Sequence, residues 1–113
     1  MTLSTIHNML EHVEGFPGRV AYNAFPEGEG VGLPFIAYRV VESANMLADN
    51  RVYCAAAVIE IELYTALKSP ETERRLENAL DAADIVWSKR ETYLSDEKCY
   101  EIIYEIEVLI DGE

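Results

Sequence analysis

The stretch from Arg51 to Thr65 (RVYCAAAVIEIELYT) constrains the fold of this chain more than any other part of the sequence. Successive residues of a β-strand point to opposite faces of a sheet, and here apolar and other residues alternate toward the end of the stretch. The alternation predicts one long strand with an apolar face and an acidic face. The apolar face carries Tyr53, Ala55, Ala57, Ile59, Ile61 and Leu63, and the other carries Val52, Cys54, Ala56, Val58, Glu60, Glu62 and Tyr64.

The stretch from Cys99 to Asp111 alternates in the same way, with Tyr100, Ile102, Tyr104, Ile106, Val108 and Ile110 on its apolar side. The two strands together place five carboxylates on one side of the predicted sheet: Glu60, Glu62, Glu101, Glu105 and Glu107. Because Val58, Ile103 and Leu109 lie among these carboxylates, the face is neither fully polar nor fully apolar. Such a face suits a subunit contact or the wall of a water-filled ring, and a solvated strand face is the simpler alternative.

The rest of the chain divides into shorter elements. Apolar spacing predicts a first helix over Met1–Glu14, with Thr2 or Ser4 as its N-cap. Further strands are expected at Arg19–Phe25, Phe35–Glu42 and Lys89–Leu94, a glycine-rich acidic loop at Pro26–Pro34, and a polar connection with a turn at Ser43–Asn50. The last three residues, 111–113, are expected to fray.

A second helix begins by clear sequence signals, with Ser69 as N-cap and Pro70 at the first helical position. Its buried stripe is predicted to be Leu76, Ala79, Leu80, Ala83 and Trp87, and its wet side Arg74, Arg75, Glu77, Asn78 and Asp81.

The resulting order α-β-β-β-α-β-β predicts a single α+β domain over residues 1–113. Its sheet is expected to be mainly antiparallel, with four to five strands and two helices packed on one face. The predicted core is Ile59, Ile61, Leu63, Ile102, Tyr104, Ile106, Leu76, Leu80 and Trp87.

The formal net charge of −12 excludes some classes of partner. A chain with 21 acidic and 9 basic residues is poorly suited to wrap nucleic acid or to bind anionic membranes, which both need clustered Lys and Arg. No apolar run approaches the ~20 residues that cross a bilayer, and Met1–Val13 lacks the pattern of a secretory signal. The expected compartment is the cytoplasm.

No motif predicts catalysis, a metal or a cofactor. Cys54 and Cys99 are expected to be inert free thiols. His7 and His12 are five residues apart on the first helix, so they cannot share a metal and are expected to be exposed. The carboxylates could in principle serve as acid and base or bind a hard cation, but strand periodicity explains them without an enzyme.

Several stretches resemble a known family: LPFIAYRV, ADNRVYCAAAVIEIELYT, the helix start at Lys68–Glu71, and KRETYLSDEKCYEIIYEIEV. They are similar to the small tail-completion proteins of long-tailed bacteriophages, which act as tail terminators or head–tail joining proteins. The matching features are the Ala48-Asp49-Asn50 turn, the Ile61–Thr65 run and the Tyr100–Glu105 pattern. The resemblance covers roughly Leu33–Val108.

This resemblance implies a non-enzymatic protein of the virion tail, assembled in the host cytoplasm. Such proteins form rings, commonly hexameric, that cap the tail tube, stop its growth and join the tail to the head. The implied partners are further copies of the chain, the tail-tube protein and a head-completion protein, with DNA passing through the ring without specific binding. The alternative is a free-standing acidic inhibitor or DNA mimic, which would be monomeric and bind a basic protein.

Overall fold

The computed structural model of the chain describes residues 1–24, 30, 32–48 and 51–110. The main sheet has five strands in the order β1-β2-β5-β7-β6. These are β1 (Val20–Tyr22), β2 (Phe35–Ser43), β5 (Ala56–Thr65), β7 (Cys99–Leu109) and β6 (Trp87–Leu94). Neighbouring strands are antiparallel, except that β1 runs parallel to β2. The predicted α+β class with a mainly antiparallel sheet is confirmed.

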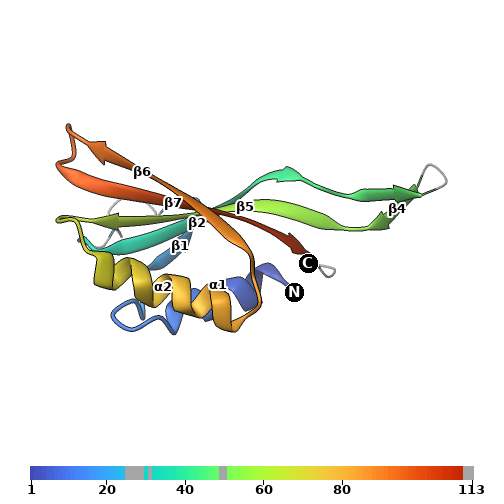
Figure 1. The fold of residues 1–113 in the computed structure, drawn as a ribbon, viewed down its shortest axis with the longest axis horizontal. Helices are drawn as coiled ribbons and strands as arrows, with labels where there is room; N and C mark the ends of the chain where they lie inside the picture. The colour runs from blue at the N-terminus through green and yellow to red at the C-terminus, as the bar shows by residue number, and fades with distance from the viewer. Residues whose placement is uncertain (25–29, 31, 49–50, 111–113) are drawn as a thin grey trace.

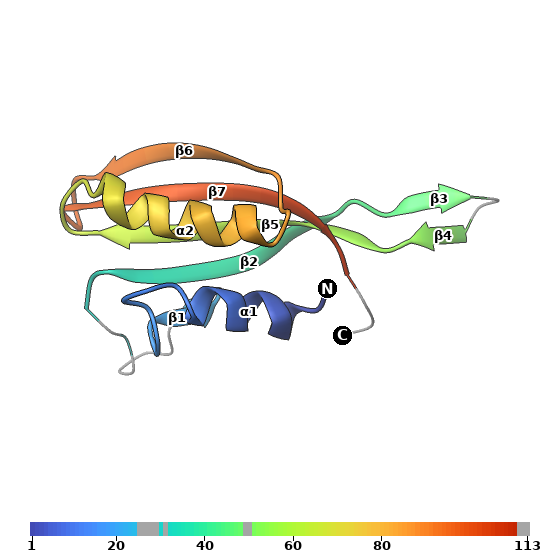
Figure 2. The ribbon, with the colours of Figure 1, turned by 60° about the horizontal axis from the view of Figure 1, so that its bottom comes forward.

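Both helices lie on one face of this sheet (Figures 1 and 2). Helix α1 (Leu3–Glu11) begins at Thr2, whose hydroxyl oxygen accepts a hydrogen bond from the backbone N–H of Thr5. Helix α2 (Pro70–Ala82) begins at Ser69, which caps the N–H of Thr72 in the same way. The opposite face, which no helix of the described residues covers, is here called the helix-free face.

The core lies between the helices and the central strands. Ile61 on β5 pairs with Tyr38 on β2 and with Tyr104 on β7, and all three are buried. Helices α1 and α2 close this layer with apolar residues of their own, such as Leu10 and Leu80. Eight of the nine residues predicted for the core are buried: Ile59, Ile61, Leu63, Ile102, Tyr104, Ile106, Leu76 and Leu80.

Trp87 is the exception, and its predicted place on the second helix is wrong. Helix α2 ends at Ala82, and Asp84 adopts a left-handed conformation with φ of 58°, which a helix cannot continue through. Trp87 therefore starts β6, two residues before the predicted strand, and pairs with Ile106. It is half-buried beside the core, and its indole N–H donates to Asp81 Oδ1 at 2.8 Å.

The predicted connection at Ser43–Asn50 is also corrected. Strand β3 (Met46–Ala48) lies within it and pairs with β4 (Arg51–Cys54), and β4 is separated from β5 at Ala55. The expected long strand from Arg51 is thus two strands in two sheets. Strands β3 and β4, here called the arm, extend beyond both helices along the longest axis of the molecule (Figure 2).

Three sequence predictions fall on residues outside the described part of the chain. They are the turn at Asp49 and Asn50, most of the loop Pro26–Pro34, and the tail at 111–113. The first helix is confirmed in type but is shorter than Met1–Glu14 at both ends, because His12 already forms its C-cap.

Candidate functional site

The strand register brings the five predicted carboxylates to the helix-free face. Glu60 on β5 lies opposite Glu105 on β7, and Glu107 lies opposite Val58. Glu62 and Glu101 occupy neighbouring rows of the same face, since their partners are Ile103 and Tyr64. The intervening residues, such as Ile61, point into the core, so the phase predicted from sequence is the phase of the strands. The five side chains nevertheless differ sharply in their surroundings.

Glu60 is neutralised within its own chain. Arg39 Nη2 on β2 lies 3.0 Å from Glu60 Oε1, and Arg90 Nη2 on β6 lies 2.8 Å from Glu60 Oε2. The hydrogen bond from Arg90 is the main reason that the pKa of Glu60 lies below its usual value, and Arg39 acts in the same direction against the effect of burial. Glu60 therefore contributes little open negative charge to the helix-free face. The two guanidinium groups also shield it, leaving Glu60 only 8% exposed.

Glu62 has the opposite electrostatic situation, although it is almost as buried at 9% exposure. Its row neighbours are Ala37 and Ile103, which offer no positive charge. Burial first, and then a hydrogen bond and charge repulsion with Glu101, raise the pKa of Glu62 to about 6.

Tyr64 completes this acidic pair. Its hydroxyl donates to Glu101 Oε2 at 2.9 Å, and its ring stacks on Phe35 with ring centroids 4.7 Å apart. Burial and the hydrogen bond to Glu101 raise the pKa of Tyr64, so it stays a proton donor throughout the physiological range. Tyr64 was absent from the site residues predicted from sequence. Its place two residues after Glu62 on the same strand face is the signal that could have included it.

Glu105 and Glu107 are exposed on the same face. Within the described part of the chain, no lysine or arginine forms an ion pair with them, or with Glu62 or Glu101. Arg19, one possible neutralising residue, instead donates to the backbone carbonyls of Gly32 and Pro34. The helix-free face thus keeps most of its negative charge.

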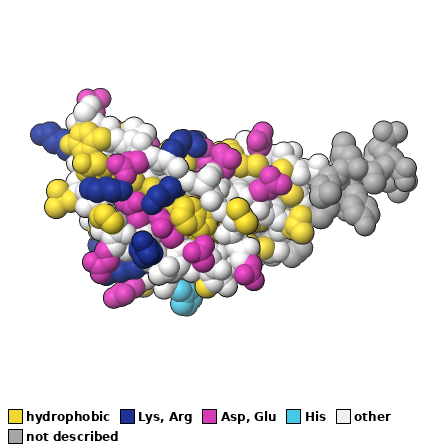
Figure 3. Space-filling view, in the orientation of Figure 1, with side chains coloured by type: hydrophobic (Ala, Val, Ile, Leu, Met, Phe, Trp, Pro, Cys, Tyr) yellow, Lys and Arg dark blue, Asp and Glu magenta, His cyan; other side chains and the backbone are white. Residues whose placement is uncertain are grey.

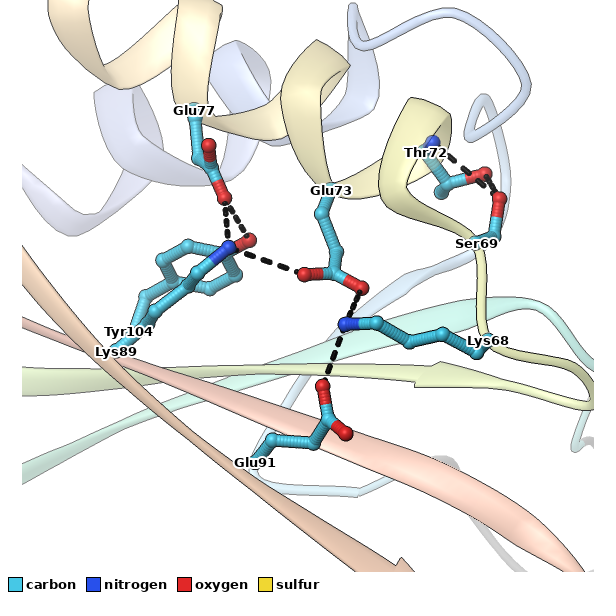
Figure 4. A network of polar contacts seen from close by, with 8 residues as sticks. All are labelled: Lys68, Ser69, Thr72, Glu73, Glu77, Lys89, Glu91 and Tyr104. Atoms are coloured by element: carbon cyan, nitrogen blue, oxygen red, sulfur yellow. Dashed lines mark hydrogen bonds and ion pairs between the residues drawn. The ribbon is translucent and has the colours of Figure 1, made fainter.

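Sequence reasoning also missed a polar network between α2 and the sheet (Figure 4). Lys89 Nζ on β6 lies 3.0 Å from Glu73 Oε1 and 2.6 Å from Glu77 Oε2. Lys68 binds the other oxygen of Glu73, and the hydroxyl of the buried Tyr104 donates to Glu77 Oε2 at 2.8 Å. Glu77, predicted on the wet side of the helix, is instead buried at the sheet, where Lys89 and Tyr104 bind its carboxylate.

The charges of this network compensate one another. Burial alone would raise the pKa of Glu73, but the hydrogen bonds and charges of Lys68 and Lys89 outweigh it and hold the pKa below its usual value. Figure 3 shows the consequence at the surface, where Lys and Arg side chains lie among Asp and Glu side chains over the half that carries α2 and β6. This half is of mixed sign despite the net charge of the chain. The network fastens α2 to β6 and β7.

The remaining residues considered from sequence lie apart from one another. His7 is half-buried, not exposed, because its Nδ1 lies 3.0 Å from the Tyr38 hydroxyl oxygen. Cys99 is a buried free thiol. Among the residues with a described position, no three His, Cys, Asp or Glu side chains are grouped so that they could hold a metal ion. None of the described helices is long and apolar enough to cross a membrane.

Comparisons with known proteins find a likeness in structure only. No protein-family model matches the sequence. No curated protein matches it either. Among solved structures, the fold is similar to a chain of the virion of a native gene transfer agent particle, with a TM-score of 0.57 and 13% identity. The match covers 96% of this chain and 86% of that one, so the two share the fold over nearly their whole length.

Proposed function

We propose that this chain is a structural virion protein that forms a ring at the end of a phage-like tail. In this role the 113 residues act as one tail-terminator-like domain, and the ring, most simply a hexamer, stops tube growth and joins the tail to the head. The observation that carries the proposal is the shared fold with a virion chain over nearly the full length of both chains. The proposed partners are further copies of the chain, a tail-tube protein and a head-completion protein.

The helix-free face is proposed to line the lumen of this ring. Among the residues that the structure describes, no lysine or arginine pairs with Glu62, Glu101, Glu105 or Glu107, and Arg39 and Arg90 on this face already bind Glu60. If the face met a neighbouring subunit, these carboxylates would need basic groups opposite them. Facing a lumen, they repel phosphate over about one Debye length, ~8 Å at physiological salt. DNA could then pass without binding to the wall.

The assembly is tested with purified protein by native mass spectrometry and negative-stain electron microscopy, alone and with a tail-tube protein of the same phage. A ring that caps the tubes and limits their length supports the proposal. A monomer that does not bind tail tubes but binds a basic protein supports the alternative of an acidic inhibitor or DNA mimic.

The lumen assignment is tested with the double variant Glu105→Gln/Glu107→Gln. Its matched control is Asp96→Asn/Glu97→Gln, which removes two exposed charges from the β6–β7 turn. In the lumen case the rings persist and DNA is retained at low salt by the first variant only. Weaker rings would place the face at a subunit contact, and no change in assembly or DNA retention would leave it a solvated surface.

A further inference from the structure

Among the residues that the structure describes, the two strands of the arm pair only with each other. Strands β3 and β4 pair with each other and form a sheet of their own, separate from the main sheet. At its base, the backbone N–H of Ala44 donates to the Ala56 carbonyl at 3.0 Å, and that of Ala56 donates to Asn45 Oδ1 at 2.9 Å. These bonds keep the arm in line with β2 and β5 and away from the body (Figures 1 and 2). A two-stranded hairpin is marginally stable alone in water, so an arm of this kind gains from a second surface.

The charge of the arm sets it apart from the rest of the molecule. Between Ala44 and Ala55 the charged residues are Asp49 and Arg51, so the segment is formally neutral, while the whole chain carries −12. Two copies of such a chain repel one another through their net charge. Contact between copies is least opposed where neutral surface meets neutral surface. The arm is one such segment, and its sequence includes the apolar residues Met46 and Leu47 and the aromatic residue Tyr53.

A second surface, formally neutral because Arg39 and Glu42 offset each other, lies along the outer edge of β2. In the described residues, β1 pairs with β2 only from Ile36 to Tyr38, so β2 has no strand partner on this side beyond Tyr38. The Tyr22 hydroxyl oxygen accepts a hydrogen bond from the N–H of Val40 at 3.3 Å, which closes the paired part of the edge. A register shift follows between Val40 and Glu42 and breaks the regular ladder to β5 at Val41. Exposed strand edges of this kind can bind a further strand.

Apolar side chains surround this free edge. Tyr22 is 47% exposed, and Val40 and Val41 are 37% and 40% exposed. A pocket of about 430 Å³ adjoins Tyr22 and reaches Leu3 and His7 of α1. Tyr22 lines this pocket with Leu3 and also accepts from the N–H of Val40. Leu3, Tyr22, Val40 and Val41 are here called the β2 edge patch. The patch offers both backbone groups and apolar contacts, as strand-addition sites do.

We propose that the arm of one subunit binds the β2 edge patch of the next copy as an added strand pair. The inference rests on the proposed ring and names the contact that closes it. Because each copy has both surfaces and the arm points away from its own patch, the contact is heterologous. Heterologous contacts make rings when the rotation closes, whereas a self-complementary patch would make dimers.

Two variants test this contact. In the first, a Gly-Ser turn replaces residues 46–54, which removes the arm and keeps β2 joined to β5. The second, Val41→Glu, places a charge in the patch at a side chain that is already part-exposed. The control Val86→Glu adds the same charge at a residue that is 87% exposed and lies on the loop before β6. Far-UV circular dichroism and thermal unfolding establish that each variant folds.

Native mass spectrometry is expected to show rings for the wild type and Val86→Glu, and monomers for the armless and Val41→Glu variants. A mixture of the last two is the decisive sample, because it contains one intact patch and one intact arm. It should give a one-to-one heterodimer that grows no further. Rings in either single variant, or no heterodimer in the mixture, would overturn the arm contact. Neither result would contradict the proposed ring itself. A wild-type chain that stays monomeric with and without tail tubes overturns both.

Discussion

Replacing Glu62 by Gln is expected to stabilise the protein at neutral pH. The pKa of Glu62 rises from its ordinary 4.5 to about 6 on folding, because the carboxyl is buried beside Glu101. A rise of about 1.5 in pKa corresponds to about 2 kcal/mol, and water that reaches the partly accessible pair lowers this to about 1–2 kcal/mol. Glutamine keeps the shape, cannot ionise, and can donate to Glu101 as the protonated carboxyl does.

The sign of the pH dependence follows from the protons bound in each state. Below pH 4.5 the carboxyl is protonated in both the folded and the unfolded chain, so Glu62 adds no pH dependence. Between pH 4.5 and about 6 the unfolded chain loses the proton first, and stability falls as the pH rises. Above pH 6 the ionised Glu62 lowers the free energy of unfolding by its full amount, about 1–2 kcal/mol. The stability gained by Glu62→Gln should therefore be near zero at pH 4 and reach its full size by pH 7.

The assay is urea unfolding followed by Trp87 fluorescence, at a series of pH values from 4 to 8. Glu60 and Glu73 have lowered pKa values, so their contributions to stability change with pH in the opposite direction. Because they are the same in both proteins, they cancel when the free energies of unfolding of variant and wild type are subtracted. Glu105→Gln, an exposed change on the same face, is the control and should show no such step. Equal stability of Glu62→Gln and wild type across this range, or a loss at pH 7, would refute the reasoning.

Three further changes test the packing by thermal and urea unfolding. Tyr104→Phe removes the hydrogen bond to Glu77 and should cost about 1 kcal/mol, and a change below measurement error would mean that Lys89 alone satisfies Glu77. Trp87→Ala should cost about 2 kcal/mol, less than the 3–5 expected of a fully buried ring, because Trp87 is half-buried; a cost above 4 would contradict this position. Ser69→Ala should cost about 1 kcal/mol through loss of the α2 cap, whereas Ser69→Asp should retain stability.

Local patterns predicted the faces of the strands well. The alternation around Ile61 and Tyr104 reflects a period of two that every strand imposes, so the core face could be assigned without the register. The start of α2 was equally clear, because Ser69 and Pro70 act within one turn of the chain. Strand β3 gave no such signal, since Met46–Ala48 is too short to show a period.

Contacts between elements could not be predicted in this way. The pairing of Glu60 with Arg39 and Arg90 depends on the register of four strands, which alternation alone does not specify. A helical projection places Glu77 on the polar side of α2. Its ion pair with Lys89 depends on the position of β6 beside the helix, which the sequence of the helix does not contain. In the sequence, Trp87 continues the apolar spacing of the helix, but α2 ends before it, where Asp84 adopts a left-handed conformation.

The Arg39–Glu60–Arg90 contact has a consequence for how the sheet keeps its alignment. Arg90 on β6 reaches past β7 to Glu60 on β5, while Arg39 approaches from β2. One carboxylate on the central strand thus links β2 to the edge strand β6. A slip of β6 by a single residue would turn Arg90 toward the helices and leave Glu60 with one partner. On the helix face, burial of apolar side chains penalises such slips. On the helix-free face a charged contact does so, and the edge strand is held in step without a covering layer.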